Sequence, residues 1–487
     1  MPVLEDASAF ARGLEALEAL AEDARLLAGL SEDERARLMR AAGRLARPTA
    51  LERSRLRKAM RLRARESRRA EDKRTREEAR IRKARAAPVY QAPARETPPA
   101  APARHLKKAR FCYVCKTPYT SLHFFYDSMC QACGDFNYEK RFQTADLSGR
   151  KALVTGARLK IGYQASLMLL RAGASVIATT RFPQDAAARY SREPDFAAWK
   201  GRLSVHGLDL RHSPSVELFA RRIAQTESRL DILINNAAQT VRRPAAFYEH
   251  LREIESLEPR ELPGGAGELL AGPVERKALL AAGAGGDAET ESQPRSRLEP
   301  LGALAPAALF PDGRLDADLQ QLDLRAVNSW RLRLAEVSTR ELLEVQLVNA
   351  VAPFILCGKL KALMLRHANG EQHVVNASAM EGVFSRHTKT DKHPHTNMAK
   401  AALNMLTLTS APDYHAGGIQ MNAVDTGWVT DEDPARHCER KREQLDFQPP
   451  LDIVDGAARL CDPVFSGLRT GRHVWGKFLK DYKPSPW

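Results

Sequence analysis

LVTGARLKIG, residues 153–162, indicates the fold of most of this chain of 487 residues. Its apolar start continues a β-type run, a short turn of small and basic residues follows, and a helical run begins at its end. A tight turn of this kind points backbone N–H groups at a pyrophosphate, and the N-terminus of the next helix adds a favourable dipole. The sequence therefore predicts a strand, a nucleotide-binding turn and a helix in succession.

Further β-type runs lie on both sides of this turn, and helical patterns separate them. The candidate strands are KALVTG (151–156), SVIATTR (175–181), RLSVHGLD (202–209), LDILINN (230–236), HVVNAS (373–378) and IQMNAVD (419–425). Strands that alternate with helices form βαβ units, whose strands lie parallel in one sheet. We therefore predict an α/β fold with a doubly wound parallel sheet over residues 147–487.

One interval in this pattern is too long for an ordinary connection. It covers about 245–335, and its part 259–313 is rich in Ala, Gly, Pro, Leu and Glu. Structureless loops of this length are uncommon inside a domain. We interpret the interval as an insertion that is partly disordered, and a lid is one hypothesis for its role.

The order of motifs in residues 147–487 resembles the short-chain dehydrogenase/reductase family. The family signature TGxxxGxG appears as Thr155, Gly156 and Gly162, with Lys160 at the middle glycine. The later matches are the adenine-contacting position at Asp209 and Leu210, the NNAG-like run Asn235-Asn236-Ala237-Ala238, the helix asparagine Asn349, and MNAVDTGWV around Asn422. The resemblance implies a Rossmann-like fold that binds a nicotinamide dinucleotide.

Charge predicts which dinucleotide is bound. A site selective for NAD carries an acidic residue at the end of the second strand, and Arg181 lies there instead, with Arg158 and Lys160 in the turn. These cations would neutralise a 2′-phosphate, so we predict NADP(H); alternatively, Arg181 is only a solvated strand end. The predicted cofactor contacts are Thr155, Gly156, Arg158, Lys160, Ile161, Gly162, Arg181, Asp209, Leu210, Asn236, Ala237, Lys400 and Thr430.

The resemblance also implies a catalytic tetrad of Asn, Ser, Tyr and Lys, and this chain departs from it. Asn349 and Lys400 match, but Thr396 stands where the family has Tyr, and an aliphatic hydroxyl is far less acidic than a phenol. Strict register places Ala379 at the serine position, with Ser378 one residue earlier. The candidate catalytic residues thus include Lys400, Asn349, Ser378 and Thr396.

A histidine-rich insert before Lys400 offers replacement chemistry. No Tyr lies between Ser378 and Lys400, whereas HTKTDKHPH contains three histidines and Asp391. Histidine titrates near neutrality and is a competent general acid, so one hypothesis is that His395 or His393 replaces the phenol. The alternative is that these histidines cap a helix while Lys400 only holds the ribose. The protein would then bind NADP(H) with little hydride transfer.

Four of the seven cysteines form two CxxC pairs, CYVC at 112–115 and CQAC at 130–133. Two such pairs complete a tetrahedral thiolate site, so Cys112, Cys115, Cys130 and Cys133 predict a structural zinc ion; a redox dithiol is the weaker alternative. His123 lies between the pairs, and we expect it to pack instead of binding metal. The three scattered cysteines fit buried thiols in a reducing compartment.

The N-terminal region is strongly basic. Residues 1–110 contain 28 Lys and Arg against 16 Asp and Glu, which gives +12 of the total +15. We predict helices in a basic region 1–86, with a capping box at Ser31 and Glu34, then a Pro/Ala-rich linker at 87–104 and a zinc module at 105–145. The run 51–85 is read as a solvated helix or as a contact with nucleic acid or an acidic protein.

No secretory signal or membrane-spanning run is evident, so we predict a cytoplasmic protein without membrane contact. Two functions fit these features. The first is an atypical NADP(H)-dependent oxidoreductase acting on a small carbonyl or alcohol. The second is a catalytically degenerate NADP(H)-binding protein that regulates a partner. A homo-oligomer is compatible with either function.

Overall fold

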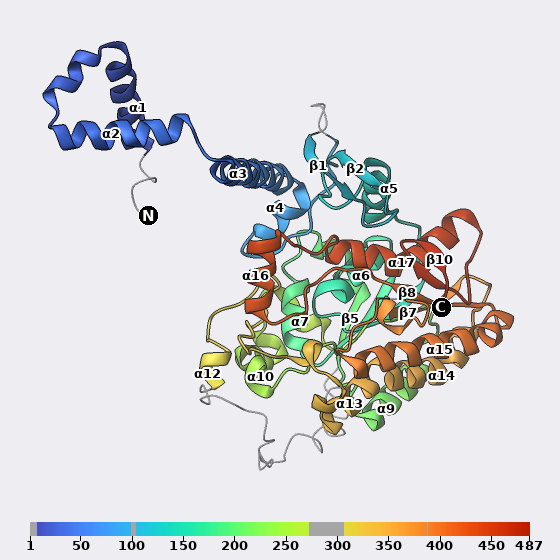
Figure 1. Ribbon diagram of the computed structural model, residues 1–487. Helices are drawn as coiled ribbons and strands as arrows, with labels where there is room; N and C mark the ends of the chain where they lie inside the picture. Colours follow the sequence, from blue (N-terminus) through green and yellow to red (C-terminus); the bar gives the residue numbers. More distant parts are fainter. Residues whose placement is uncertain (1–6, 99–103, 272–305, 387) are drawn as a thin grey trace. The chain divides into compact units, whose positions relative to one another are not determined.

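The computed structural model describes residues 7–98, 104–271, 306–386 and 388–487 (Figure 1). The chain divides into two compact units, Met1–Asp72 and Lys73–Trp487, and each is described by itself. Part of the predicted linker (99–103), the centre of the predicted insertion (272–305) and His387 lie outside the described residues.

Helices make up the described part of the first unit. They are α1 (Ala7–Glu22), η1 (Ala24–Gly29), α2 (Glu32–Ala46) and most of α3 (Ala50–Glu77), whose last turn belongs to the second unit. The predicted capping box begins α2, because Ser31 Oγ accepts from the Glu34 N–H and the Glu34 carboxylate accepts from the Ser31 N–H. Thr49 and Glu52 repeat the arrangement at α3. Every side chain of residues 50–71 is exposed.

An eight-stranded sheet forms the centre of the second unit, in the order β10-β9-β8-β7-β6-β3-β4-β5. Its strands are β3 (Lys151–Thr155), β4 (Ser175–Thr180), β5 (Leu203–Gly207), β6 (Ile232–Asn235), β7 (Gln372–Ser378), β8 (Ile419–Asp425), β9 (Phe478–Lys480) and β10 (Lys483–Ser485). The strands pair in parallel except for β10, which is antiparallel to β9. The predicted α/β fold and its six strands are confirmed, while β9 and β10 are additions.

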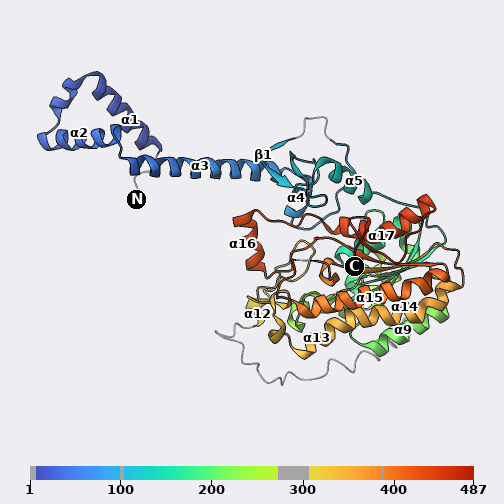
Figure 2. The same ribbon diagram turned by 45° about the vertical axis from the view of Figure 1, so that its right-hand side comes forward.

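Helices cover both faces of the sheet (Figure 2). One face carries α6 (Lys160–Arg171), α7 (Pro183–Tyr190) and α17 (Ile453–Thr470); the other carries α9 (Ser213–Thr226), α14 (Ala352–Leu365) and α15 (Pro394–Ala416). Each face has its own apolar cluster, and β-strand residues are buried on both sides. The near-continuous apolar strands follow from this double burial.

The chain reverses its direction across the sheet after β5. From β3 it adds β4 and then β5 on one side, and it returns to place β6 on the other side of β3. The turn that opens α6 therefore lies where neighbouring connections diverge. In α/β sheets this switch point leaves a crevice at the carboxyl ends of the strands.

The cysteine module forms a separate small core against the α/β domain. It contains β1 (His105–Phe111) and β2 (Pro118–Ser121), which pair antiparallel, and α5 (Gln131–Arg141). Arg141 is fully buried and binds Asp452 (2.6 Å) and Asp455 (2.9 Å) at the start of α17. The module thus packs firmly on the α/β domain through a charged contact surrounded by aromatic residues.

The end of the basic run belongs structurally to this module. In α4 (Arg80–Ala86), the N–H groups of Arg80 and Ile81 donate to the carbonyls of Phe124 and Phe125. Arg82 is buried against Asp127 and Asp446. The solvated helix expected over 51–85 therefore ends early, because acidic groups inside the protein bind its last arginines.

The described parts of the insertion fold over the edge and the open end of the sheet. Their helices are η3 (Ala245–Leu251), α10 (Arg252–Ser256), η4 (Pro259–Glu261), η5 (Pro263–Leu269), α12 (Pro306–Leu309), η6 (Ser329–Arg331) and η7 (Leu334–Glu336). Leu270 forms a parallel bridge with Val205, so this segment covers the edge strand β5. Covering an edge strand removes a surface for unwanted pairing.

The other short elements are α8 (Phe196–Trp199), η2 (Lys200–Arg202), α13 (Thr339–Gln346), η8 (Leu347–Val351), η9 (Met380–Gly382) and α16 (Ala435–Leu445). Among the described residues, the continuous helical run Thr339–Leu365 has the length and apolar composition of a membrane span, but half of its most apolar window is buried inside the protein. Core helices of globular proteins have the same character.

Candidate functional site

A cavity of about 1040 Å³ opens at the carboxyl ends of the strands, at the switch point between β3 and β6. The predicted residues that line it are Gly156, Arg158, Lys160, Ile161, Gly162, Arg181, Asp209, Leu210, Asn236, Ala237, Ser378, Thr396, Lys400 and Thr430. Thr155, Asn349 and His395 lie behind the lining. Most of the residues singled out in the sequence thus meet in one place.

The turn after β3 is a cradle that requires glycine at two positions. Gly156 has a φ of +67°, and a Cβ there would lie 2.9 Å from the Cα of Ala237. A Cβ on Gly162 would lie 2.3 Å from the Gly156 carbonyl oxygen and 2.4 Å from Asn236 Nδ2. The Thr155 hydroxyl supports the cradle, since it accepts from the Ala237 N–H at 3.1 Å. A ligand can therefore approach the backbone closely.

Lys160 takes the place of the middle glycine with a positive φ of 55°. Its ammonium lies 3.9 Å from the Asp318 carboxylate of the insertion. Burial lowers the pKa of Lys160, but the charges of Glu432 and Asp318 outweigh burial and leave the pKa raised. Lys160 is therefore a half-buried cation held between carboxylates at the mouth of the glycine turn.

Two arginines lie where a 2′-phosphate was predicted. Arg158 is buried and binds Asp185 at 2.7 Å. Arg181 is exposed; it donates to the Tyr248 hydroxyl at 2.6 Å and lies over the rings of Phe182 and Tyr248. Arg181 is thus the more available cation, because a carboxylate already neutralises Arg158.

The other predicted cofactor positions have local partners. Asp209 accepts from Arg211 through both carboxylate oxygens, which outweighs burial and leaves its pKa lowered. The Thr430 hydroxyl donates to Glu432 at 2.6 Å. The side chain of Ile161 packs closely on Gly456 at the start of α17. These contacts fix the cavity wall from β5 to the segment after β8.

Lys400 lies in the cavity on α15 and is buried. Its ammonium donates to the carbonyl of Ala377 at the end of β7, at 2.6 Å. Burial lowers its pKa to about 8, although Glu381 and Asp425 oppose the shift. Asn349 supports the site from behind: its amide oxygen accepts from the Gln239 N–H at 2.7 Å.

Two hydroxyls near Lys400 have different environments. Ser378 donates to Asn404 Oδ1 at 2.5 Å, which ties the end of β7 to α15. The Thr396 hydroxyl is buried and has no hydrogen-bond partner among the described residues. Thr396 precedes Lys400 by four residues, so both lie on the cavity-facing side of α15. Thr396 therefore has an unused hydroxyl at the position of the family Tyr.

The histidines separate into one that faces the cavity and one that does not. His393 lines the cavity, stacks on Trp330 with ring centroids 3.8 Å apart, and shares a hydrogen bond with Asn397 at 3.1 Å. His395 is buried, and its Nε2 lies 3.7 Å from Glu341 on α13. Asp391 binds Arg333 on the surface. The charged group beside His395 is thus Glu341, whereas Asp391 binds Arg333 and Lys400 binds the Ala377 carbonyl.

Several cavity residues were not anticipated from the sequence. Tyr113 enters the cavity from between two cysteines of the module, and its hydroxyl accepts from the Trp428 N–H at 3.1 Å. Tyr248 comes from the insertion. No local pattern reveals such positions, because they depend on contacts between segments far apart in the chain.

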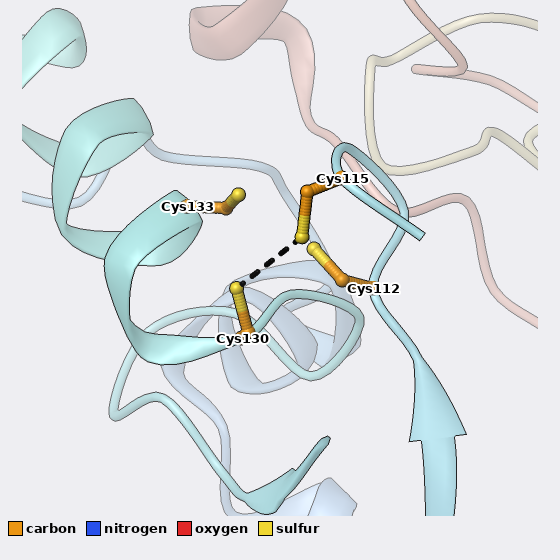
Figure 3. Close-up of side chains that lie close together, drawn as sticks. All are labelled: Cys112, Cys115, Cys130 and Cys133. Carbon is orange, nitrogen blue, oxygen red and sulfur yellow. Dashed lines mark hydrogen bonds between the residues drawn. The ribbon is translucent and has the colours of Figure 1, made fainter. Parts of the chain in front are cut away.

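The four cysteines converge as predicted (Figure 3). Their Sγ atoms all lie within 4.8 Å of one another, and those of Cys115 and Cys130 are 3.7 Å apart. A zinc ion with Zn–S bonds of about 2.3 Å needs sulfur atoms about 3.8 Å apart, so the four thiols fit this ion. His123 is not a ligand, because its Nδ1 accepts from two backbone N–H groups and its Nε2 contacts Asp135.

The cavity also fits a dinucleotide. Its volume is adequate for a large ligand, the glycine cradle leaves room for a phosphate at the helix N-terminus, and Thr396 offers an unpaired polar group elsewhere in the lining. The cations Arg181 and Lys400 are placed at different parts of the same cavity. The residues present are thus compatible with the predicted cofactor.

Comparisons with known proteins agree with this arrangement. The family model described as short chain dehydrogenase matches residues 150–257. An uncharacterized protein of Acanthamoeba polyphaga mimivirus is 32% identical over 391 residues, which cover 76% of this chain and 74% of that protein. Retinol dehydrogenase 13 of Mus musculus is 36% identical over 96 residues, which cover 19% of this chain and only 28% of that protein.

Solved structures with a similar fold include NADPH-bound carbonyl reductase from chicken fatty liver, at 18% identity and a TM-score of 0.39, covering 70% of this chain and 100% of that one. A short chain dehydrogenase from Burkholderia cenocepacia in complex with NADP has 19% identity and a TM-score of 0.42, covering 68% of this chain and 96% of that one. The family model, the mimivirus relative that aligns over 391 residues and the order of the motifs together show that this chain belongs to the short-chain dehydrogenase/reductase family.

Proposed function

We propose that the protein is an NADP(H)-dependent oxidoreductase that acts on a small carbonyl or alcohol without the family tyrosine. The observation that carries this proposal is the combination, in one cavity, of buried Lys400 and the unpartnered hydroxyl of Thr396. Burial of a lysine destabilises its charged form, and an unpartnered buried hydroxyl is rare in folded proteins. Both features favour a ligand that completes the site.

The cofactor assignment follows the chemistry of the lining. The backbone of Gly156–Gly162 would receive the pyrophosphate, Arg181 the 2′-phosphate with Arg158 behind it, and Lys400 the ribose hydroxyls. When bound, the nicotinamide supplies or accepts the hydride. These residues orient it and exclude water from the inner part of the cavity.

Lys400 is the group we assign to proton transfer. A pKa of about 8 keeps its ammonium protonated at pH 7 while making it a far better acid than a solvated lysine. The Thr396 hydroxyl would bind the substrate oxygen and pass the proton from the ammonium. Ser378 is bound to Asn404 and would instead hold β7 against α15.

Binding is tested by titrating the full-length protein with NADPH and NADH and following nucleotide fluorescence. Gly162→Ala should weaken NADPH binding on the order of tenfold or more, because the new Cβ would collide with the Gly156 carbonyl. Gly358→Ala is the matched control: Gly358 is exposed on α14, with nothing within 4 Å of a Cβ. Unchanged affinity in Gly162→Ala would reject the cradle as the phosphate site.

Turnover is tested with panels of aldehydes, ketones and alcohols. Thr396→Val should lower kcat on the order of 10²-fold, Thr396→Ser should restore much of it, and Lys400→Met should abolish it. His395→Gln should leave kcat unchanged, because His395 contacts Glu341 outside the cavity lining. A loss of kcat in His395→Gln together with full activity in Thr396→Val would transfer the proton-donor role to histidine.

A second candidate function is nucleotide binding without turnover. It is favoured by Lys160, which carboxylates of the protein already surround, and by the missing phenol before Lys400. In that case NADPH binds and Gly162→Ala weakens it, but no substrate in the panels oxidises NADPH at high protein concentration. That outcome would reject the oxidoreductase proposal and leave the binding proposal standing.

A further inference from the structure

Tyr113 connects the cysteine module to the cavity. It lies between the metal-ligand candidates Cys112 and Cys115, and its side chain lines the cavity. Its hydroxyl accepts from the backbone N–H of Trp428 at 3.1 Å. The residue therefore belongs to the metal loop by its backbone and to the nucleotide cavity by its side chain.

The segment that Tyr113 contacts leaves no room for a side chain at Gly427. Gly427 has a φ of +77°, and a Cβ there would lie 3.4 Å from the Tyr113 hydroxyl and 2.3 Å from Leu451 Cδ1. Asp425 holds the same segment, since its carboxylate accepts from the Gly427 N–H at 3.1 Å and from Lys480 at 3.2 Å. Tyr113 is thus one of the contacts that fix the cavity wall after β8.

The backbone on each side of Tyr113 is fixed within the metal loop. The Cys112 N–H donates to the Thr117 carbonyl at 2.9 Å, and the Lys116 N–H donates to the Cys112 carbonyl at 3.1 Å. The Tyr113 N–H donates to the Ser128 carbonyl at 2.8 Å. A metal ion would bond the cysteines that flank Tyr113 and join this loop to α5. Without the ion, the Cys112–Cys115 loop would lose its bonds to α5, and these backbone bonds would hold Tyr113 together with Lys116 and Lys480, whose ammonium groups lie over its ring.

We propose that metal occupancy of the four cysteines controls nucleotide binding in the cavity through Tyr113. The ion holds the Cys112–Cys115 loop, the loop holds the phenol, and the phenol holds the Gly427–Trp428 segment against the ligand. This inference rests on the proposed NADP(H) function for the identity of the ligand. Linkage requires the reverse effect as well: bound nucleotide raises the affinity for metal by the same factor.

Tyr113→Phe is the central variant, because it keeps the ring and the metal ligands and removes only the hydroxyl. Loss of one hydrogen bond should weaken NADPH binding about two- to tenfold. Tyr119→Phe is the matched control: its hydroxyl donates to the Asp127 carbonyl at 2.8 Å inside the same module, and it does not line the cavity. We expect NADPH affinity in Tyr119→Phe to equal that of the wild type.

Metal removal tests the remaining link. Full-length protein is stripped with a chelator, its zinc content is measured, and it is then reloaded with Zn²⁺ alone. Stripping should weaken NADPH binding at least as much as Tyr113→Phe does, and reloading should restore it. In Tyr113→Phe, stripping should cause a smaller further loss than in the wild type, since the transmitting hydroxyl is already absent.

Hydrogen exchange at the Trp428 amide gives a readout that needs no nucleotide. Exchange should quicken in Tyr113→Phe and in stripped protein, but not in Tyr119→Phe. If exchange at Trp428 is unchanged in both, the inference is wrong whatever binds in the cavity. If exchange quickens but the wild type binds no nucleotide, the proposed function fails. If the wild type binds NADPH and neither stripping nor Tyr113→Phe weakens it, control by metal is rejected while the function stands.

Discussion

Burial of the single charged group of Lys400 lowers the stability of the folded protein. Its pKa of about 8, against 10.5 for the unperturbed group, means that the charged form is destabilised in the native state. Lys400→Met should therefore raise the free energy of unfolding at pH 7 by about 1–3 kcal/mol, while it removes activity. Stability and the proposed activity would then change in opposite directions, as expected if Lys400 serves the proposed reaction.

The pH dependence of this effect has a defined sign. Below pH 8 Lys400 is protonated in both the native and the unfolded state, so the full destabilisation by its buried charge is present. Between about pH 8 and 10.5 the native state has released the proton and the unfolded state has not, so the wild type gains stability relative to Lys400→Met. Urea unfolding at pH 7 and pH 10 measures the closing of this gap. Lys359→Met, at an exposed site on α14, should show no such trend.

Individual residues were predictable where backbone geometry or motif order fixes them. Gly156 and Gly162 were located from the tight turn and the family signature that it resembles, and Lys400 from the same resemblance. The choice between His393 and His395 was not predictable. His393 is the left-handed N-cap residue that precedes α15, and His395, in the first turn of the helix, lies beside Glu341. Which face each histidine takes depends on where the helix starts, and the sequence did not reveal that residue.

At the scale of elements, α5 and α17 are joined by charge. Arg141 is fully buried between Asp452 and Asp455, so Arg141→Met would leave two carboxylates buried without their cation. We expect the free energy of unfolding to fall by about 3–5 kcal/mol. Thermal or urea unfolding of the full-length protein measures it.

The control for this prediction is Arg95→Met. Arg95 binds Glu139 of the same helix α5, but both side chains are more than half exposed. An exposed ion pair contributes about 0–1 kcal/mol, so the variant should unfold almost as the wild type does. Equal losses in both variants would mean that the buried charges do not carry the docking of α5 on α17.

The predicted strands were recovered because each parallel strand is buried on both faces and reads as a continuous apolar run. β9 and β10 have three residues each, too few for any periodic signal. The α4 segment was grouped with the solvated basic helix because composition does not show that Arg82 meets Asp127 and Asp446 inside the fold. Pairing between distant charges is a tertiary property that a local pattern cannot contain.

For the whole molecule, the two units should be separable. The first unit carries exposed basic residues along α3, and the cavity and cysteines all lie in the second. We expect protein lacking residues 1–72 to keep NADPH affinity, zinc content and melting temperature within error. A cut at 104 should instead destabilise the remainder, because α4 packs into the cysteine module.

We also propose that the first unit supplies whatever affinity the protein has for nucleic acid. Binding to duplex DNA or RNA should then fall steeply between low and physiological salt, because phosphate contacts release counterions. It should disappear when residues 1–72 are removed. Gel-shift titrations of both proteins over a salt series measure this. Binding that is insensitive to salt, or that survives the cut, would assign it elsewhere.

The contact between Arg141 and Asp452 has a consequence for synthesis of the chain. The two residues are 311 positions apart, and ribosomes add roughly 5–20 residues per second. The guanidinium therefore waits on the order of 15–60 seconds before its partner leaves the ribosome. During that time the nascent cysteine module lacks the carboxylates that pair with Arg141, and it can be stabilised by pairing of β1 with β2 and by capture of a metal ion, which need only its own residues.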